Sequence, residues 1–191
     1  MEEMKQRILT QGEVLPGHIL KVGSFLNQQI DCAFLERMGR EVASLFAGCG
    51  VTKVLTIESS GIAIAASVGM AMNVPMIFAK KHQTSNVSGR VLSTVIHSYT
   101  HGNDYTAVVS AEYLLPGDRV LLVDDFLANG NALEGLIRMV EGAGATVVGA
   151  ACAIEKGFQH GGDKLRERGY RVESLAIVET MEDDGTVTFR P

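Results

Sequence analysis

The chain of 191 residues is close to the ~150 residues of one typical domain, so we predict a single domain over residues 1–191. Hydrophobic residues make up 46% and charged residues 20%, which is enough apolar material for a buried core and excludes intrinsic disorder. The 17 basic residues are outnumbered by 22 acidic ones, and the net charge of −5 opposes binding of a polyanion. We therefore expect no nucleic-acid partner.

The cysteines and the apolar segments indicate where the protein works. Cys32, Cys49 and Cys152 stand far apart without a C-x-x-C pair, so we predict neither a disulfide framework nor a zinc site. The first residues lack the basic start and apolar run of a secretory signal. The longest apolar stretch, residues 62–72, is too short to span a bilayer. We expect a soluble, cytoplasmic protein without a membrane partner.

The first part of the chain predicts a short helix, irregular chain and a longer helix. Apolar residues recur on one face over residues 2–11, and Gly12 stands in the position of a C-cap glycine. Residues 13–30 follow no period and contain a Pro16-Gly17 turn, so we predict a loop-rich segment. Asp31 is placed to cap the next helix, whose apolar residues repeat at three-to-four spacing.

The next segment has the pattern of one parallel-sheet unit. An apolar run at residues 53–57 predicts a strand, and the turn 58–61 follows it. Residues 62–72 are small and apolar and predict a helix, and residues 74–79 predict a second strand. Two parallel strands joined by a helix are the expected result.

Residues 85–104 are polar with interspersed β-branched side chains, which favours a mobile hairpin more than a core element. Residues 105–110 return to a strand pattern.

The C-terminal half alternates strands and helices. We predict strands at residues 119–123, 146–154 and 171–178, a helix that ends near Gly142, and a helix over residues 163–168 before a polar tail. The alternation predicts an α/β fold with a doubly wound, mostly parallel sheet.

Two adjacent carboxylates follow the buried strand that begins at residue 119. Asp124 and Asp125 are succeeded by a turn with small residues at Ala128, Gly130 and Ala132, which opens a helix. Small residues let backbone N–H groups converge, and the helix dipole favours an anion there, so the turn is suited to a phosphate without a basic side chain. Carboxylates beside that phosphate can accept hydrogen bonds from a ribose diol, directly or through hydrated Mg²⁺. The predicted ligand is a ribose 5-phosphate.

Other interpretations of this segment stay open from the residues alone. The interpretation that the acidic pair only ends a strand and caps the next helix has roughly half the weight, because short motifs often match by chance. Neither the Gly-Lys-Ser/Thr of a Walker loop nor G-x-G-x-x-G is present. Asn131, three residues before Glu134, matches a variant of the capping box.

The segment Val-Leu-Leu-Val-Asp-Asp-Phe-Leu-Ala-Asn-Gly-Asn-Ala, residues 120–132, resembles the phosphoribosyl-diphosphate (PRPP) motif of the type I phosphoribosyltransferases. Other parts of the chain resemble the bacterial xanthine phosphoribosyltransferases, and together they cover nearly all of it. These parts are residues 20–27, 57–62, 78–82, 154–158 and 169–175.

The resemblance implies transfer of ribose 5-phosphate from PRPP to xanthine, which gives xanthosine 5′-monophosphate and pyrophosphate in purine salvage. It also implies Mg²⁺ bound with PRPP or pyrophosphate, a homodimer, an N-terminal helix and hood over the base (together residues 1–30), and a flexible hairpin loop.

By the same resemblance, specific residues receive roles. Asp124 and Asp125 are the catalytic pair. The PRPP-binding residues, called the phosphate loop below, are Ala128, Asn129, Gly130, Asn131 and Ala132. Leu20, Asn27 and Lys156 contact the base, the turn 58–61 and Lys81 face the pyrophosphate, and Phe126 offers a stacking face. For Lys156 taken alone, an ordinary surface lysine is the more common reading.

The sequence departs from the wider superfamily at two positions. Asn129 stands where most members have Thr, and Ala128 stands where the hypoxanthine-guanine branch has an additional Asp, which argues against that branch. An adenine phosphoribosyltransferase and a PRPP-sensing purine regulator remain as alternatives. The regulator would need a DNA-binding segment, and only a short helix precedes the predicted hood.

Overall fold

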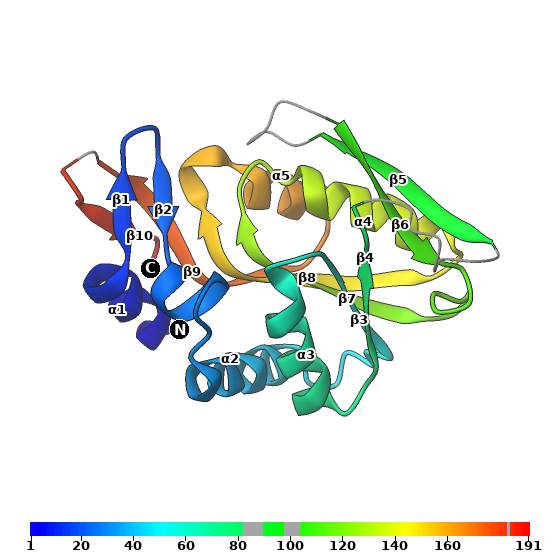
Figure 1. The fold of residues 1–191 in the computed structure, drawn as a ribbon. Coiled ribbons are helices and arrows are strands. Elements are labelled where there is room, and N and C mark those ends of the chain that lie inside the picture. The colour runs from blue at the N-terminus through cyan, green and yellow to red at the C-terminus, as the bar shows by residue number, and fades with distance from the viewer. Residues whose placement is uncertain (82–89, 98–103, 183) are drawn as a thin grey trace.

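The structure is a computed structural model that describes residues 1–81, 90–97, 104–182 and 184–191 (Figure 1). A central sheet of six strands has the order β10-β9-β8-β7-β3-β4. Its strands are β3 (Lys53–Ile57), β4 (Met76–Ala79), β7 (Arg119–Leu127), β8 (Thr146–Lys156), β9 (Val172–Met181) and β10 (Val187–Phe189). Only β10 is antiparallel to its neighbour.

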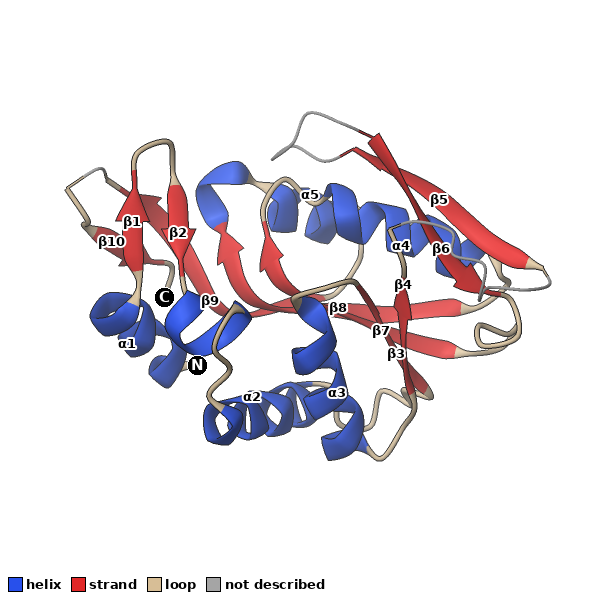
Figure 2. Ribbon diagram, viewed as in Figure 1, coloured by secondary structure: helices blue, strands red, loops and turns tan. Residues whose placement is uncertain are grey.

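The predicted doubly wound α/β fold is confirmed. Four helices cover the two faces of the sheet: α2 (Cys32–Leu45), α3 (Gly61–Met72), α4 (Asn131–Gly142) and α5 (Gly161–Glu167). Figure 2 shows α2 and α3 below the sheet and α4 and α5 above it. In the described residues, no helix is both long and apolar enough to cross a membrane.

Strand β7 shows why both faces need covering. Its residues Leu121 and Val123 belong to the core shared with α2 and α3, whereas Val120 and Leu122 belong to the core shared with α4. Side chains alternate between the faces of a strand, so an unbroken apolar run places a core on each side.

Helix α2 begins as predicted. The Asp31 side chain accepts a hydrogen bond from the Phe34 N–H at 3.0 Å and caps the helix. The helix lies close against α3 because Gly39 has no side chain: a Cβ there would collide with the Ser67 side chain and backbone. The Ser67 hydroxyl donates to the Leu35 carbonyl at 2.8 Å, which joins the two helices.

The N-terminal segment differs from the prediction after its first helix. Helix α1 (Glu2–Gln11) is confirmed, but Gly12 is extended, with φ −78°, and is not a left-handed cap. Glycine is needed there because a Cβ would collide with the Ile8 carbonyl oxygen.

The predicted loop over residues 13–30 is wrong in part. The chain forms a hairpin of β1 (Glu13–Leu15) and β2 (Ile19–Lys21) and then one π-helical turn, Gly23–Asn27. Strands of three residues are too short to show alternation in a sequence.

A second hairpin stands apart from the central sheet. Strands β5 (Val91–His97) and β6 (Asp104–Ser110) pair antiparallel along their whole length. Residues 85–89 and 98–103 of the predicted mobile hairpin lie outside the described residues. Within the described part of that segment, Ile96 is buried in the core with α4, contrary to the prediction. The strand predicted over residues 105–110 is confirmed, and its Ala107 and Val109 are buried in the same core. Lys80, next to β4, bridges to Val108 and ties the hairpin to the sheet.

The tail also differs from the prediction. Residues 187–189 form the edge strand β10 on β9, although they follow polar chain. The antiparallel partner supplies the hydrogen bonds that give this short segment its conformation.

Candidate active site

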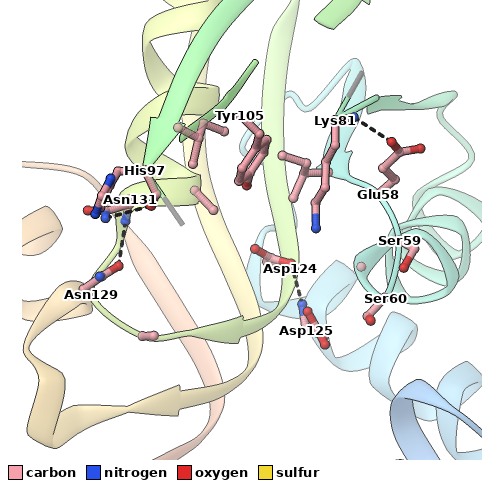
Figure 3. A pocket seen from close by; sticks show the side chains of 15 residues that line it. Glu58, Ser59, Ser60, Lys81, His97, Tyr105, Asp124, Asp125, Asn129 and Asn131 are labelled. Carbon is pink, nitrogen blue, oxygen red and sulfur yellow. Dashed lines mark hydrogen bonds between the residues drawn. The ribbon is translucent and has the colours of Figure 1, made fainter. Parts of the chain in front are cut away.

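The candidate site lies where the winding of the sheet reverses. From β3 the chain passes through α3 to β4 on one side, and from β7 it passes through α4 to β8 on the other. Ligands of open α/β sheets bind beyond the carboxyl ends of the strands at such a switch point. A pocket of about 280 Å³ lies there, lined by the turn after β3, the end of β7 and the start of α4 (Figure 3).

The acidic pair lies inside β7, not beyond its end as predicted, because β8 continues the ladder alongside it. Asp124 is opposite Cys152 in that register and is 6% exposed. The Asp125 N–H donates to Asp124 Oδ1 at 2.9 Å. Burial raises the pKa of Asp124 well above its usual range, and the Asp125 charge raises it further, whereas Lys81 opposes the shift. The two adjacent carboxylates therefore favour the binding of a positively charged group.

The phosphate loop joins β7 to α4. Gly130 has φ +92° and is the N-cap of α4, without a side-chain cap hydrogen bond. The capping box predicted for Asn131 and Glu134 is therefore wrong. Asn131 is the first helical residue, and its amide donates to the His97 carbonyl at 3.1 Å, while its own N–H donates to Asn129 Oδ1 at 3.2 Å. A helix start without a side-chain cap suits a bound anion.

Four of the five residues of the loop line the pocket: Ala128, Asn129, Asn131 and Ala132. The fifth, Gly130, shapes the turn, because its left-handed φ is one that side chains rarely adopt.

The turn 58–61 forms the facing wall. Glu58, Ser59, Ser60 and Gly61 line the pocket, and Glu58 Oε1 accepts the Lys81 N–H at 2.6 Å. Figure 3 shows the Lys81 side chain extending toward the acidic pair. Gly61 is close to Asp124: a Cβ there would be 3.1 Å from Asp124 Oδ1. The acidic pair, a cation and a turn of the backbone therefore share one pocket.

The three predicted base contacts lie on the hood side of this pocket and do not line it. The Asn27 amide donates to Asp125 Oδ2 at 3.4 Å, a long hydrogen bond. Lys156 Nζ donates to the His18 carbonyl at 2.8 Å and lies 5.9 Å from the Phe126 ring centroid. Burial lowers the pKa of Lys156.

Leu20 and Asn27 line a neighbouring cavity of about 540 Å³ in the hood. Leu20 itself is buried in the core that also holds helix α2. The structure thus brings Asn27 to the acidic pair and Lys156 to the hood, while Leu20 and Asn27 line a cavity separate from the pocket of the acidic pair.

Sequence reasoning missed three lining residues, Ile96, His97 and Tyr105, which come from the β5–β6 hairpin. His97 Nδ1 lies 2.6 Å from Asp104 Oδ1, and Lys81 Nζ lies 5.4 Å from the Tyr105 ring centroid. Burial and the Asp124 charge raise the pKa of Tyr105. No local pattern marks these residues, because the packing of the hairpin on α4 carries them to the pocket.

His97 and His101 are four residues apart in the sequence, but the β-branched run before them disfavours a helix and no third ligand is evident, so the pattern predicts no zinc site. His101 lies outside the described residues. Among the residues that the structure does describe, no group of three His, Cys, Asp or Glu side chains is placed to hold a metal ion.

Comparison with known proteins decides the family. The model of the phosphoribosyl transferase domain matches residues 36–184. The chain belongs to the phosphoribosyltransferase family. Transfer of a phosphoribosyl group, a glycosyltransferase-type activity, is accordingly the activity of this protein.

Relatives match over the whole chain. A xanthine phosphoribosyltransferase of Bifidobacterium adolescentis is 52% identical over 192 residues, with all of both chains covered. Those of Heliobacterium modesticaldum and Pseudomonas entomophila are 51% and 48% identical over 189 residues, covering 99% of this chain and 100% and 99% of theirs.

Solved structures share the type I phosphoribosyltransferase fold. The adenine phosphoribosyltransferase of Thermoanaerobacter pseudethanolicus has a TM-score of 0.74 at 21% identity, with 92% of this chain and 98% of that chain covered. The Giardia lamblia enzyme complexed with 9-deazaadenine has a TM-score of 0.74 at 23% identity, with 93% and 98% covered. At this identity the likeness concerns the fold.

Proposed function

We propose that the protein transfers ribose 5-phosphate from PRPP to xanthine and releases xanthosine 5′-monophosphate and pyrophosphate, as an enzyme of purine salvage. One observation carries the proposal: the acidic pair of β7 and the uncapped start of α4 line one pocket. A carboxylate pair beside an anion site matches a phosphorylated ribose that develops positive charge. The names of relatives about 50% identical over the full chain support xanthine as the base.

In this proposal the two halves of the pocket divide PRPP between them. The phosphate loop holds the 5′-phosphate through backbone N–H groups and the dipole of α4. Asp124 and Asp125 accept hydrogen bonds from the ribose hydroxyls. The turn 58–61 and Lys81 face the pyrophosphate, where the lysine neutralises charge on the leaving group.

The donor set fits Mg²⁺ bound together with PRPP or pyrophosphate. Mg²⁺ is commonly held by one or two carboxylates, with substrate phosphates and water completing its shell. Asp124 and Asp125 supply such carboxylates, and the raised pKa of Asp124 reflects a buried charge that a cation would compensate. Bound there, Mg²⁺ would neutralise charge on pyrophosphate.

The reaction is a displacement at the anomeric carbon of the ribose. A ring nitrogen of the base forms the new bond to that carbon, and the bond to the pyrophosphate oxygen breaks, with its electron pair leaving on pyrophosphate. The base reacts as its anion, having given its proton to solvent, and the nearby Lys156 ammonium favours that anion. Asp124 stabilises the oxocarbenium-like charge on the sugar, so that orientation and electrostatics supply the rate.

Recognition of xanthine rests on Lys156. Its ammonium is partly buried, has lost part of its water, and lies near the Phe126 ring. A cation in that setting gains more from the oxygens or the anionic ring of a dioxopurine than a fully hydrated lysine would. Leu20 supplies apolar contact and Asn27 supplies amide donors and acceptors. The His18 carbonyl holds Lys156 Nζ until the base replaces it.

The test compares the initial rates of pyrophosphate release from PRPP with xanthine, guanine, hypoxanthine and adenine. We expect the highest kcat/KM for xanthine. A preference for adenine would overturn the choice of base, and no release with any base would favour a PRPP-sensing regulator.

Lys156→Gln sharpens the test. The substitution should lower kcat/KM for xanthine by about 10-fold to 150-fold, the value of a charge-assisted hydrogen bond of roughly 1.5 to 3 kcal/mol. PRPP affinity should stay unchanged. Lys164→Gln on the exposed face of α5 is the matched control. An equal proportional fall for every base would assign Lys156 to general catalysis or structure.

A further inference from the structure

A buried carboxylate beneath the site has no part in the proposed reaction. Glu155 is fully buried in β8. The Arg166 guanidinium donates to both of its oxygens, at 2.8 and 2.7 Å, and the Ser174 hydroxyl donates to Oε2 at 2.5 Å. The carboxylate is buried, whereas the Arg166 side chain is 30% exposed. An ion pair that buries a charge is often no more stabilising than apolar side chains of the same volume. Stability alone is therefore a weak reason for its presence.

The pair stands between the two substrate regions. Glu155 is opposite Leu127 in the β7–β8 register, directly before the phosphate loop, and the next residue along β8 is Lys156. Arg166 belongs to α5, and its Nε also donates to the Val172 carbonyl at 3.2 Å. The pair thus fixes α5 to both β8 and β9.

The first two residues of α5 lie between the Glu155 carboxylate and the phosphate loop. A Cβ on Gly161 would collide with Ala128 O, Asn129 C and the Gly130 nitrogen. A Cβ on Gly162 would collide with the Glu155 carboxylate. Two successive glycines therefore bring α5 into backbone contact with the loop on one side and with the carboxylate on the other. A shift of α5 must move the loop.

We infer that Glu155 and Arg166 are positioning residues that hold the phosphate loop in its PRPP-binding form through α5. The inference rests on the proposed function, because it assigns PRPP to the loop. Neither side chain lines the pocket, so both act through the backbone of residues 128–130. The Arg166 fork, with its planar geometry, sets both the distance and the orientation of the helix.

The experiment is a calorimetric PRPP titration of the parent, Glu155→Gln, Arg166→Met and the double variant, at a temperature where thermal unfolding curves show each to be folded. We expect each single variant to bind PRPP roughly 10-fold or more weakly, since a misplacement of about 1 Å can cost about 100-fold. The double variant should be no weaker than the singles, because the two residues act as a unit. KM for the base at saturating PRPP should stay near the parent value.

Glycine substitutions test the mechanical link. Gly161→Ala leaves the ion pair intact but should weaken PRPP binding, because its Cβ displaces the loop. Gly142→Ala in α4, where a Cβ meets nothing within 4 Å, is the matched control and should bind as the parent does. If the charge variants do not fold, Ser174→Ala takes their place, because it removes one hydrogen bond to Glu155 and keeps both charges.

The outcomes separate the two proposals. A parent that does not bind PRPP refutes the proposed function. A parent that binds, together with a folded Glu155→Gln or Ser174→Ala that binds equally well, refutes the positioning role. Equal losses of PRPP and base affinity would show that Glu155 and Arg166 serve only the general structure of the protein. That result would also refute the positioning role.

Discussion

Asp124 combines deep burial with a proposed role in catalysis that needs its negative charge. The side chain is 6% exposed, and its neighbour Asp125 adds repulsion within the same pocket. In the ligand-free protein the ionised form is therefore held at a cost, which a cationic sugar or a bound cation relieves. A residue of this kind improves function and weakens the fold at once.

Asp124→Asn should separate these two effects. The change is nearly isosteric, and Asn Oδ1 still accepts the Asp125 N–H, so the fold should persist. Removal of the charge should lower kcat by about 100-fold or more, as loss of one electrostatic contact to a transition state does. Initial rates at saturating PRPP measure the loss, and unchanged turnover would contradict the catalytic role of Asp124.

The same variant should be more stable than the parent at pH 7, by about 0.5 to 2 kcal/mol. The folded protein holds the Asp124 proton more tightly than the unfolded chain does, because the folded pKa is raised above 3.8. Parent stability is therefore lowered progressively as the pH rises above about 4. Denaturant unfolding at pH 4 and pH 7 should show a higher free energy of unfolding for Asp124→Asn than for the parent only at pH 7. Asp125→Asn, at a partly exposed position, is the control: it should lose activity and gain less stability than Asp124→Asn.

At the scale of elements, the phosphate loop depends on backbone geometry more than on side-chain identity. Gly130 has φ +92°, and the loop lies against the start of α5. The same dependence lets Asn129 stand where relatives of the superfamily have Thr, since the proposed phosphate contacts come from the backbone.

Gly130→Val should weaken PRPP binding, because a branched side chain restricts the turn and disfavours its left-handed φ. Gly117→Val is a matched control: Gly117 has φ +86°, and a Cβ there meets nothing within 4 Å. Both variants should lose about 1 to 2 kcal/mol of stability from the backbone conformation. Only Gly130→Val should lose calorimetric PRPP affinity, and equal affinities in the two variants would refute the loop assignment.

At the scale of the whole molecule, ion pairs hold the C-terminal end of the chain against α5 and β9. Arg190 donates to Asp163 of α5 at 2.7 Å and to Glu179 of β9 at 2.8 Å. The hydrogen bond from Arg190 lowers the pKa of Asp163 from 3.8 to about 2. The tail therefore helps to hold the helix that supports the phosphate loop.

This ion pair predicts a pH-dependent contribution to stability. Because the folded pKa of Asp163 is depressed, its contribution is present above pH 4 and is lost as the pH falls toward 2. Asp163→Asn should lower the free energy of unfolding by about 1 kcal/mol at pH 7, after allowance for the partial exposure of Asp163. The difference from the parent in the free energy of unfolding should shrink between pH 4 and pH 2. A difference independent of pH would mean that the side chain acts through packing and not through its charge.

Homodimerisation follows from the family resemblance and stays a prediction. Sedimentation should give twice the 20.5 kDa chain mass at micromolar concentration. A monomer mass at every concentration would contradict it.

The sequence alone determined the features that depend on neighbours in the chain. The Asp31 cap, the alternation of strands and helices, and the acidic pair before a glycine-containing turn all rest on contacts within a few residues, and the structure confirms each of these local features. Lys156 at the end of β8 is predicted as a base contact only through the resemblance, since an isolated lysine has no local signature, and that role stays a prediction.

Tertiary structure decided the features that depend on distant segments. The edge strand β10 and the continuation of β7 through the acidic pair follow from pairing with neighbouring strands. His97 reaches the pocket through the packing of a hairpin on α4, and Glu155 meets Arg166 only when α5 folds back on the sheet. A periodic pattern records which face of an element is buried, but the partner on that face is chosen when the whole chain packs.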